Sequence, residues 1–194
     1  MSLTPWRGFL TRALYRNRSL PHARYLQLAT IRNDGKPANR TVVFRGFLEE
    51  SDRLQFVTDA RSEKAQQIAH QPWGEICWYF PKTREQFRIS GNLILVREKH
   101  PENSLLKARL MAWQQLSDAA RQQFAWPHPG APRAEAEAFS PPLPSPSEPL
   151  SNFCLLLLEP QQVDFLELRG EPQNRYIYRL EGAHRTWVVQ TVNP

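Results

Sequence analysis

Short segments rich in β-branched and aromatic residues recur along the chain between turn signals, and this pattern constrains the fold more than any other feature. The first five cover residues 25–32, 37–47, 54–58, 75–80 and 86–96. Asn33-Asp34-Gly35-Lys36, between the first two, is typical of a tight hairpin turn. Pro81-Lys82-Thr83, between the last two, has the length that joins antiparallel neighbours. The pattern predicts a mainly β fold of the α+β class, built around an antiparallel barrel.

Two stretches change to a helical pattern. Residues 59–70 place their apolar side chains on one helical stripe, and Gln71-Pro72 should end that helix. Residues 101–124 carry an apolar face that includes Trp113, with Ser117 as the expected N-cap of a second, short helix. We therefore expect a few peripheral helices around the barrel.

A proline-rich segment interrupts the β pattern. Eight of the 17 prolines lie in residues 127–149. Because proline lacks a backbone N–H, this composition cannot supply the donors of regular structure, and we expect a mobile loop. The strand pattern then returns at residues 153–158, 163–168, 175–180 and 186–192. A chain of 194 residues organised in this way is expected to form a single domain over residues 1–194.

Charge and cysteine content narrow the class of protein. The formal net charge of +6 at pH 7 implies an attraction to anions, which include nucleic acid, acidic lipid and phosphorylated small molecules. Cys77 and Cys154, the two cysteines, each lie in an apolar run, where a free thiol behaves as a small buried hydrophobe. We expect neither a disulfide framework nor a metal site.

The sequence has neither a targeting signal nor a common phosphate-binding loop. The first residues lack the apolar stretch of a secretory signal, and no run approaches the roughly 18 apolar residues of a spanning helix. We therefore expect a soluble cytoplasmic protein with no membrane partner. Glycine-rich phosphate loops are also missing, so a bound phosphate would depend on side-chain cations and helix-terminal amides.

Three groups of polar residues could form such a site. Arg40 and Arg45 lie on an otherwise apolar strand, and Ser62 and Lys64 open the helix after the third strand. Because Arg40 and Arg45 are five positions apart, they point to opposite faces of a regular strand unless a bulge intervenes. The third group is a polar row on one strand face, formed by Arg84, Gln86, Arg88 and Ser90. That row also fits a solvent-exposed sheet face.

The order of these pieces resembles the FMN-binding split barrels related to pyridoxine/pyridoxamine 5′-phosphate oxidase. That family opens its barrel with Ala-Thr-x-x-x-x-Gly-x-Pro-x-x-Arg-Thr-Val, which residues 29–42 match. The resemblance covers residues 25–96 and returns at Val163-Asp164-Phe165 and Asn174-Arg175-Tyr176. It implies an antiparallel six-stranded split β-barrel, an FMN cofactor, and a homodimer with FMN at the subunit interface.

The resemblance also implies which residues bind the cofactor. The positions carried over are Arg40, Thr41, Val42, Val43, Arg45, Thr58, Ser62, Lys64, Gln86 and Arg175. Arg40 and Lys64 would neutralise the FMN phosphate, with the hydroxyls of Thr58 and Ser62 donating hydrogen bonds beside them.

The remaining positions would surround the flavin. The backbone of residues 41–43 would run along the flavin, and Arg45 would lie near its ring. Gln86 would reach the ring edge from the partner subunit, and Arg175 would match an arginine that approaches the flavin across the dimer interface.

The chain departs from the family pattern at the substrate positions. Leu166 stands where true pyridoxamine-phosphate oxidases have a tryptophan, and Glu171 and Gln173 stand where an Arg-x-His pair holds their substrate. Glu63 also replaces a basic residue of the phosphate site. Residues 112–130 look more like a cyanobacterial and plant subgroup of uncharacterised reaction. We therefore expect an FMN-dependent oxidoreductase with a different substrate, and the sequence identifies no catalytic residue.

Two other classes of function fit the same sequence. A non-catalytic FMN carrier would have the same cofactor site, so the sequence cannot separate it from an enzyme. A nucleic-acid-binding β-barrel would explain the positive charge and the aromatic content. The dispersal of the basic residues argues against that barrel, and we expect no nucleic-acid partner.

Overall fold

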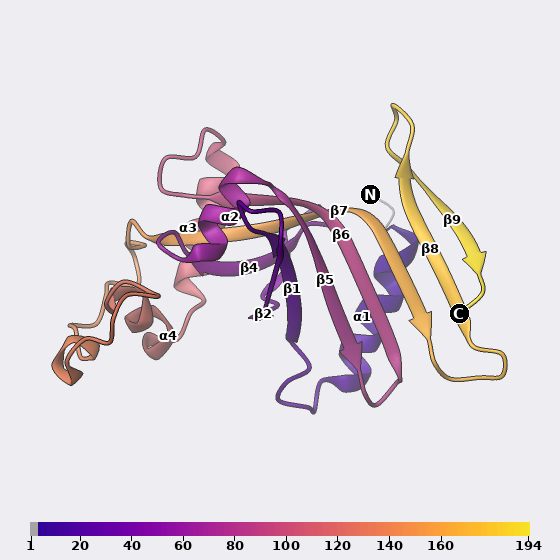
Figure 1. Ribbon diagram of the computed structural model, residues 1–194, viewed down its shortest axis with the longest axis horizontal. Helices are drawn as coiled ribbons and strands as arrows, with labels where there is room; N and C mark the ends of the chain where they lie inside the picture. The colour runs from indigo at the N-terminus through magenta and orange to yellow at the C-terminus, as the bar shows by residue number, and fades with distance from the viewer. Residues whose placement is uncertain (1–3) are drawn as a thin grey trace.

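The computed structural model describes residues 4–194, which form one curled antiparallel sheet with four α-helices packed around it (Figure 1). The strands are β1 (Tyr25–Ile31), β2 (Pro37–Val43), β3 (Gly46–Phe47), β4 (Leu54–Asp59), β5 (Trp73–Phe80), β6 (Glu85–Val96), β7 (Phe153–Glu167), β8 (Asn174–Glu181) and β9 (Thr186–Val192). The helices are α1 (Pro5–Asn17), α2 (Glu63–His70), α3 (Asn103–Gln114) and α4 (Asp118–Gln122), with 3-10 helices η1 (Gln123–Ala125) and η2 (Ala136–Phe139). The expected mainly β split barrel is confirmed.

One long strand, β7, joins the parts of the sheet. The strand order is β2-β1-β5-β6-β7-β4-β3, and the hairpin of β8 and β9 continues from β7. β7 is a single 15-residue strand where two were expected, because its first part pairs with β4 and its second part with β8. The sheet formed by residues 4–194 has nine strands instead of the six expected around the barrel, since the β8–β9 hairpin extends it beyond β7.

The first part of β7 is apolar because both of its faces are buried. Leu156 and Leu158 pack into the barrel core, whereas Leu155 and Leu157 pack on the opposite face with Trp113 of α3. A strand covered on both faces reads as a continuous apolar run instead of an alternation. The helix α3 therefore supplies the second hydrophobic layer of the fold.

The N-terminal helix α1 was not predicted. Its buried residues are Trp6, Leu10, Ala13 and Asn17. These positions follow each other at intervals of three or four, which is a helical spacing. The Trp6 ring lies 5.9 Å from that of Trp187 in β9, so α1 connects the beginning of the chain to its last strand.

The other predicted helices are confirmed, and the proline-rich segment is anchored between them and β7. α2 forms within residues 59–70, and Ser117 caps α4 by accepting a hydrogen bond from the backbone of Ala120. Residues 127–149 contain η2 and otherwise irregular backbone. Near the end of this segment, Trp113 Nε1 donates to the carbonyl oxygen of Ser145 at 2.8 Å.

Two remaining expectations concern thiols and membranes. Cys154 is buried and Cys77 is half-buried, both as free thiols. None of the helices in the described part of the chain combines the length and the apolar character needed to cross a membrane.

A β-bulge fixes the register between β6 and β7. The pairing shifts between Ser90 and Gly91, where Ser90 is opposite Gln162 and Gly91 is opposite Pro160. A Cβ atom on Gly91 would overlap the carbonyl oxygen of Glu159, so the two backbones approach as closely as they do only because residue 91 is glycine.

We predict that Gly91→Ala lowers the free energy of unfolding by about 1–3 kcal/mol, because the added methyl group forces the two strands apart. Gly8→Ala is the matched control, since no atom lies within 4 Å of the added carbon and the site is helical. The control should be neutral or stabilising, by up to about 1 kcal/mol. Urea unfolding of both variants measures the difference, and equal midpoints would contradict the prediction.

Candidate functional site

Arg40 is held against the end of the barrel by hydrogen bonds to uncharged groups. It lies on the edge strand β2, opposite Leu28 of β1, and therefore shares the inward face of the sheet. Its Nη1 donates to Thr30 Oγ1 at 2.6 Å and to the carbonyl oxygen of Leu28 at 3.1 Å. Its Nη2 donates to Gln67 Oε1 of α2 at 3.0 Å. Partial burial lowers the pKa of Arg40, although a guanidinium remains charged.

Lys64 converges on the same region from the start of α2. Its Nζ lies 3.1 Å from Thr58 Oγ1 and 3.5 Å from Ser62 Oγ. Burial is the main cause that lowers the pKa of Lys64, and the positive charge of Arg40 lowers it further. We call Arg40 and Lys64, with the adjacent hydroxyls of Thr58 and Ser62, the cation cluster. Its two positive charges repel each other in a partly desolvated site.

These cations have no directly paired carboxylate in the described part of the chain, although Glu63 and Asp59 lie near enough to attract Arg40 and Lys64 more weakly. Among residues 4–194, no carboxylate forms an ion pair with Arg40, Arg45 or Lys64. The neighbouring Glu63 is turned to Gln67, from which it accepts a hydrogen bond at 2.7 Å, and to Arg32 at 3.7 Å. Partly buried positive charge without a carboxylate is a binding site for an anion.

Arg45 is separated from Arg40 by a break in the strand. β2 ends at Val43 and β3 begins at Gly46, whose φ of +133° is a conformation that favours glycine. In a regular strand, Arg40 and Arg45 would point to opposite faces, and this break interrupts that alternation between them. Arg45 lines a cavity together with Thr58, so the hydroxyl beside Lys64 and the second arginine border the same space.

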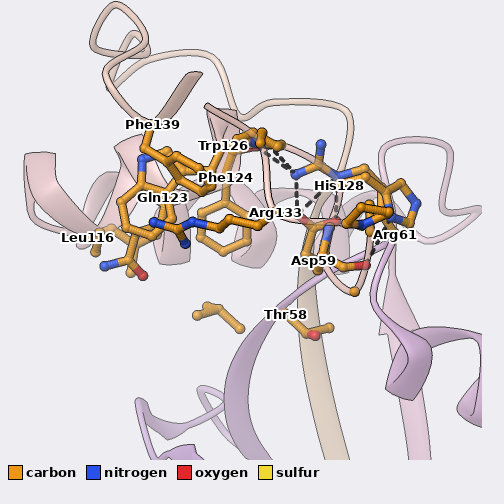
Figure 2. A pocket seen from close by; sticks show the side chains of 18 of the residues that line it. Thr58, Asp59, Arg61, Leu116, Gln123, Phe124, Trp126, His128, Arg133 and Phe139 are labelled. Carbon is orange, nitrogen blue, oxygen red and sulfur yellow. Dashed lines mark hydrogen bonds and ion pairs between the residues drawn. The ribbon is translucent and has the colours of Figure 1, made fainter. Parts of the chain in front are cut away.

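That cavity has a volume of about 550 Å³, within the range of small-molecule sites. One wall is the end of β4 and the turn after it, from Val57 to Arg61. The opposite wall is supplied by residues 123–134 and Phe139 (Figure 2). Arg133 extends across this wall, with its guanidinium carbon 4.2 Å from the centroid of the Phe139 ring.

An ion pair ties the two walls together. Arg61 forms a two-pronged pair with Asp59, with Nη2 at 2.7 Å from Oδ2. The same Nη2 donates to the carbonyl oxygens of Phe124 and Trp126, both at 3.2 Å (Figure 2). Asn152 Nδ2 donates to Asp59 Oδ2 at 2.8 Å and to the carbonyl oxygen of Phe124 at 2.9 Å. We call Asp59, Arg61 and Asn152 the clamp.

Gln86 and Arg175 lie elsewhere in the chain. Gln86 of β6 and Arg175 of β8 are both directly opposite Leu166 of β7, so the three form one row across the sheet. Arg175 makes a two-pronged ion pair with Asp164, with Nη2 at 2.8 Å from Oδ2. Figure 1 shows β8 well apart from α2, so one chain does not bring this row to the cation cluster.

Sequence reasoning identified the cation cluster but not the second wall of the cavity. Phe124, Trp126, His128, Arg133 and Phe139 line it. The clustering of aromatic residues just before and within the proline-rich segment was the available signal. This signal does not show which side chains face a cavity, because irregular backbone has no regular alternation of side-chain directions.

The comparisons with known proteins agree with this geometry. The family described as "Pyridoxamine 5′-phosphate oxidase, FMN-binding domain" matches residues 3–97. The "Pyridoxine/pyridoxamine 5′-phosphate oxidase 2" of Arabidopsis thaliana is 41% identical over 194 residues, which are 99% of this chain and 98% of that protein. The chain belongs to the pyridoxamine 5′-phosphate oxidase FMN-binding family.

Other similar proteins include one that matches in part and two with solved structures. The pyridoxine/pyridoxamine 5′-phosphate oxidase of Acinetobacter baumannii is 31% identical over 111 residues, which are 53% of this chain and 49% of that protein. Among solved structures, a pyridoxamine 5′-phosphate oxidase-related, FMN binding protein from Nostoc punctiforme is 59% identical, with a TM-score of 0.96 and full coverage of both chains. PhzG from Burkholderia lata is 20% identical with a TM-score of 0.80, covering 99% of this chain and 94% of that chain, and shares the fold.

The cofactor of this family member is FMN, and the residues present fit it. A phosphate monoester is a dianion near neutral pH, and Arg40 and Lys64 supply two positive charges without carboxylate partners. The hydroxyls of Thr58 and Ser62 lie beside the ammonium group. The cation cluster therefore has the chemistry that a phosphate group requires.

We predict a pH-dependent contribution of Asp59 to stability. Burial alone would raise the pKa of Asp59, but hydrogen bonds from Arg61 and Asn152 lower it overall. A lowered pKa stabilises the fold above the pKa of the unfolded chain, and this stabilisation is lost as the pH falls through the folded-state pKa. Asp59→Asn should therefore cost about 1–3 kcal/mol at neutral pH and less in acid. Urea unfolding across this pH range measures it, and a pH-independent cost would contradict the assignment.

Proposed function

We propose that this chain is an FMN-dependent oxidoreductase whose substrate differs from pyridoxamine 5′-phosphate. The observation that carries the proposal is the cation cluster, in which Lys64 lies beside two hydroxyls and near Arg40, and neither cation has a carboxylate in an ion pair within residues 4–194. Thr58, one of the two hydroxyl residues, also lines the small-molecule cavity. A cluster of this kind is costly unless an anion is bound, because the cations repel each other when water is removed.

In this proposal, the FMN phosphate lies between β4, α2 and the inward face of β2. Arg40 and Lys64 neutralise it, and Thr58 and Ser62 donate hydrogen bonds to its oxygens. Thr30 and Gln67 orient the Arg40 guanidinium, since both accept hydrogen bonds from it. Its Nε makes no hydrogen bond among residues 4–194 and remains available to a ligand.

The flavin part would extend along the edge strand. β2 is the last strand on its side of the sheet, so the outer side of the backbone at Thr41, Val42 and Val43 has no strand partner within residues 4–194. Arg45 lies at the end of this strand and lines the cavity. When bound there, FMN supplies the acceptance and release of hydride or single electrons. The protein supplies orientation and positive charge.

A second copy of the chain would complete the site. Gln86 and Arg175 share a row on the outer face of the sheet, and that face carries other polar groups, including Arg88 and Asp164. We propose that a homodimer brings this row of one subunit to the flavin held by the other. Asp164 would keep the Arg175 side chain extended for that contact.

The substrate positions argue for another substrate than pyridoxamine 5′-phosphate. Glu171 and Gln173 lie in the connection between β7 and β8, where the resemblance places the Arg-x-His pair of the true oxidases. A glutamate carboxylate repels a phosphorylated substrate, and a glutamine amide carries no charge to attract it. The relative from Arabidopsis thaliana bears the name of the oxidase, so activity toward this substrate must be measured directly.

We predict that Arg40→Ala weakens FMN binding about 10- to 100-fold, since a hydrogen bond to a charged group contributes about 1.5–3 kcal/mol. Arg32→Ala is the matched control, because Arg32 lies near the cluster but is half-exposed and paired with Glu63. Titration of the apoprotein with FMN, followed by flavin fluorescence, measures both affinities. An unchanged affinity in Arg40→Ala would refute the phosphate assignment.

Turnover separates the proposed enzyme from an FMN carrier. We expect NADH or NADPH to reduce the bound flavin in the absence of oxygen, and air to reoxidise it with consumption of oxygen. We also expect no catalytic conversion of pyridoxamine 5′-phosphate to pyridoxal 5′-phosphate. Flavin that responds to dithionite but to neither nicotinamide would identify a carrier, and sustained pyridoxal 5′-phosphate formation would refute the substrate argument.

A further inference from the structure

The clamp and the cation cluster belong to the same short turn. Thr58 and Ser62 face Lys64, whereas Asp59 and Arg61, which alternate with them, face the proline-rich side. The turn is closed by its own hydrogen bonds, because Ser62 Oγ donates to the carbonyl oxygen of Asp59 at 2.7 Å. Arg61 N donates to Asp59 Oδ1 at 2.8 Å. A shift in the positions of Thr58 and Ser62 therefore also shifts Asp59 and Arg61.

The clamp is also the link between this turn and the start of the cavity's second wall. Arg61 and Asn152 together bind the carbonyl oxygens of Phe124 and Trp126, which directly precede the prolines. Ala60 N donates to the carbonyl oxygen of Asn152 at 2.7 Å, which fixes the clamp to the start of β7. Proline has no N–H, so the segment beyond Trp126 can supply few backbone donors of its own.

The far end of the segment is held independently of the clamp. Arg109 of α3 donates to the carbonyl oxygens of Leu150 at 2.8 Å and Phe153 at 3.0 Å. Between the two attachments, Arg133 is exposed and lies on the wall of the cavity. Gln122 Nε2 donates to the carbonyl oxygen of Pro141 at 2.9 Å, and Trp113 holds Ser145, so the chain after the wall is also attached. The first part of the wall, at Phe124 and Trp126, depends on the clamp.

We propose that Arg61 is a positioning residue that couples FMN binding to the docking of residues 123–139, so that the phosphate and the docked wall stabilise each other. This inference rests on the proposed function of the cation cluster. Without an anion, repulsion between Arg40 and Lys64 strains the turn that presents Asp59 to Arg61. A bound phosphate removes that repulsion, fixes Thr58 and Ser62, and thereby fixes the clamp.

Coupling of this kind is reciprocal. If FMN favours the docked wall by some factor, loss of the clamp weakens FMN binding by up to the same factor. The wall borders the cavity next to Arg45, so the space beside the cofactor would take its full shape only in the FMN-bound protein. Arg61 thus acts on the cavity through the position of its second wall.

Trypsin cleavage after Arg133 reports undocking, because the protease must bind several residues on both sides of the cleaved bond in extended form. Arg133 is exposed in the middle of the wall, so undocking of its neighbours is the step that limits cleavage there. We expect saturating FMN to slow the appearance of the fragment that begins at Ala134 by about fivefold or more in the full-length protein. Mass spectrometry resolves this fragment from other cleavages. When the wall docks again faster than trypsin cleaves, the cleavage rate is proportional to the fraction of molecules in which the wall is undocked.

Three variants separate positioning from general stability. In Arg61→Ala and in the charge-neutral Asn152→Ala, cleavage should be fast and should no longer respond to FMN. Arg32→Ala, which removes a nearby positive charge outside the clamp, should keep the full FMN effect. Asn152→Ala also serves if Arg61→Ala does not fold.

The outcomes distinguish this inference from the proposed function. If the wild-type protein does not bind FMN in the flavin fluorescence titration, the proposed function fails. If it binds FMN but cleavage after Arg133 is unchanged, or if both clamp variants keep the FMN effect, the coupling alone is overturned.

Discussion

Arg40 and Lys64 place two positive charges close together in a partly desolvated site where, within residues 4–194, no carboxylate forms an ion pair with either of them. Such an arrangement is unfavourable by itself and must be stabilised by the surrounding fold. The β1–β2 hairpin holds Arg40, α2 holds Lys64, and the end of β4 supplies Thr58. The barrel core fixes these three elements relative to one another and keeps the two positive charges together, and in the proposed function a bound phosphate offsets their repulsion.

The strand β7 connects the cation cluster to the polar residues on the far part of the sheet. Its first part pairs with β4, which carries Thr58, and its second part carries Leu166 in one row with Gln86 and Arg175. One strand thus sets the separation between the cation cluster and the polar row. Because β8 lies well apart from α2 in one chain (Figure 1), the proposed two-chain site is the arrangement that could bring both groups to one flavin.

Much of this arrangement was predictable from local sequence signals. The Asn-Asp-Gly turn predicts the β1–β2 hairpin, and its register then puts Arg40 opposite Leu28. α1 was missed because its apolar positions are few and the helix depends on Trp6 meeting Trp187, a contact between the two ends of the chain. The cavity wall was missed for a related reason: the carbonyl groups of Phe124 and Trp126 are held by side chains from residues 61 and 152, and no local pattern encodes such long-range bonds.

If the cation cluster holds a phosphate, FMN and riboflavin should bind very differently, since the two ligands differ only by that group. Calorimetric titration of the wild-type apoprotein with each ligand measures the difference. We expect FMN to bind at least about 100-fold more tightly, because two charge-assisted contacts of about 1.5 kcal/mol each are lost with riboflavin. Equal affinities for the two ligands would contradict it.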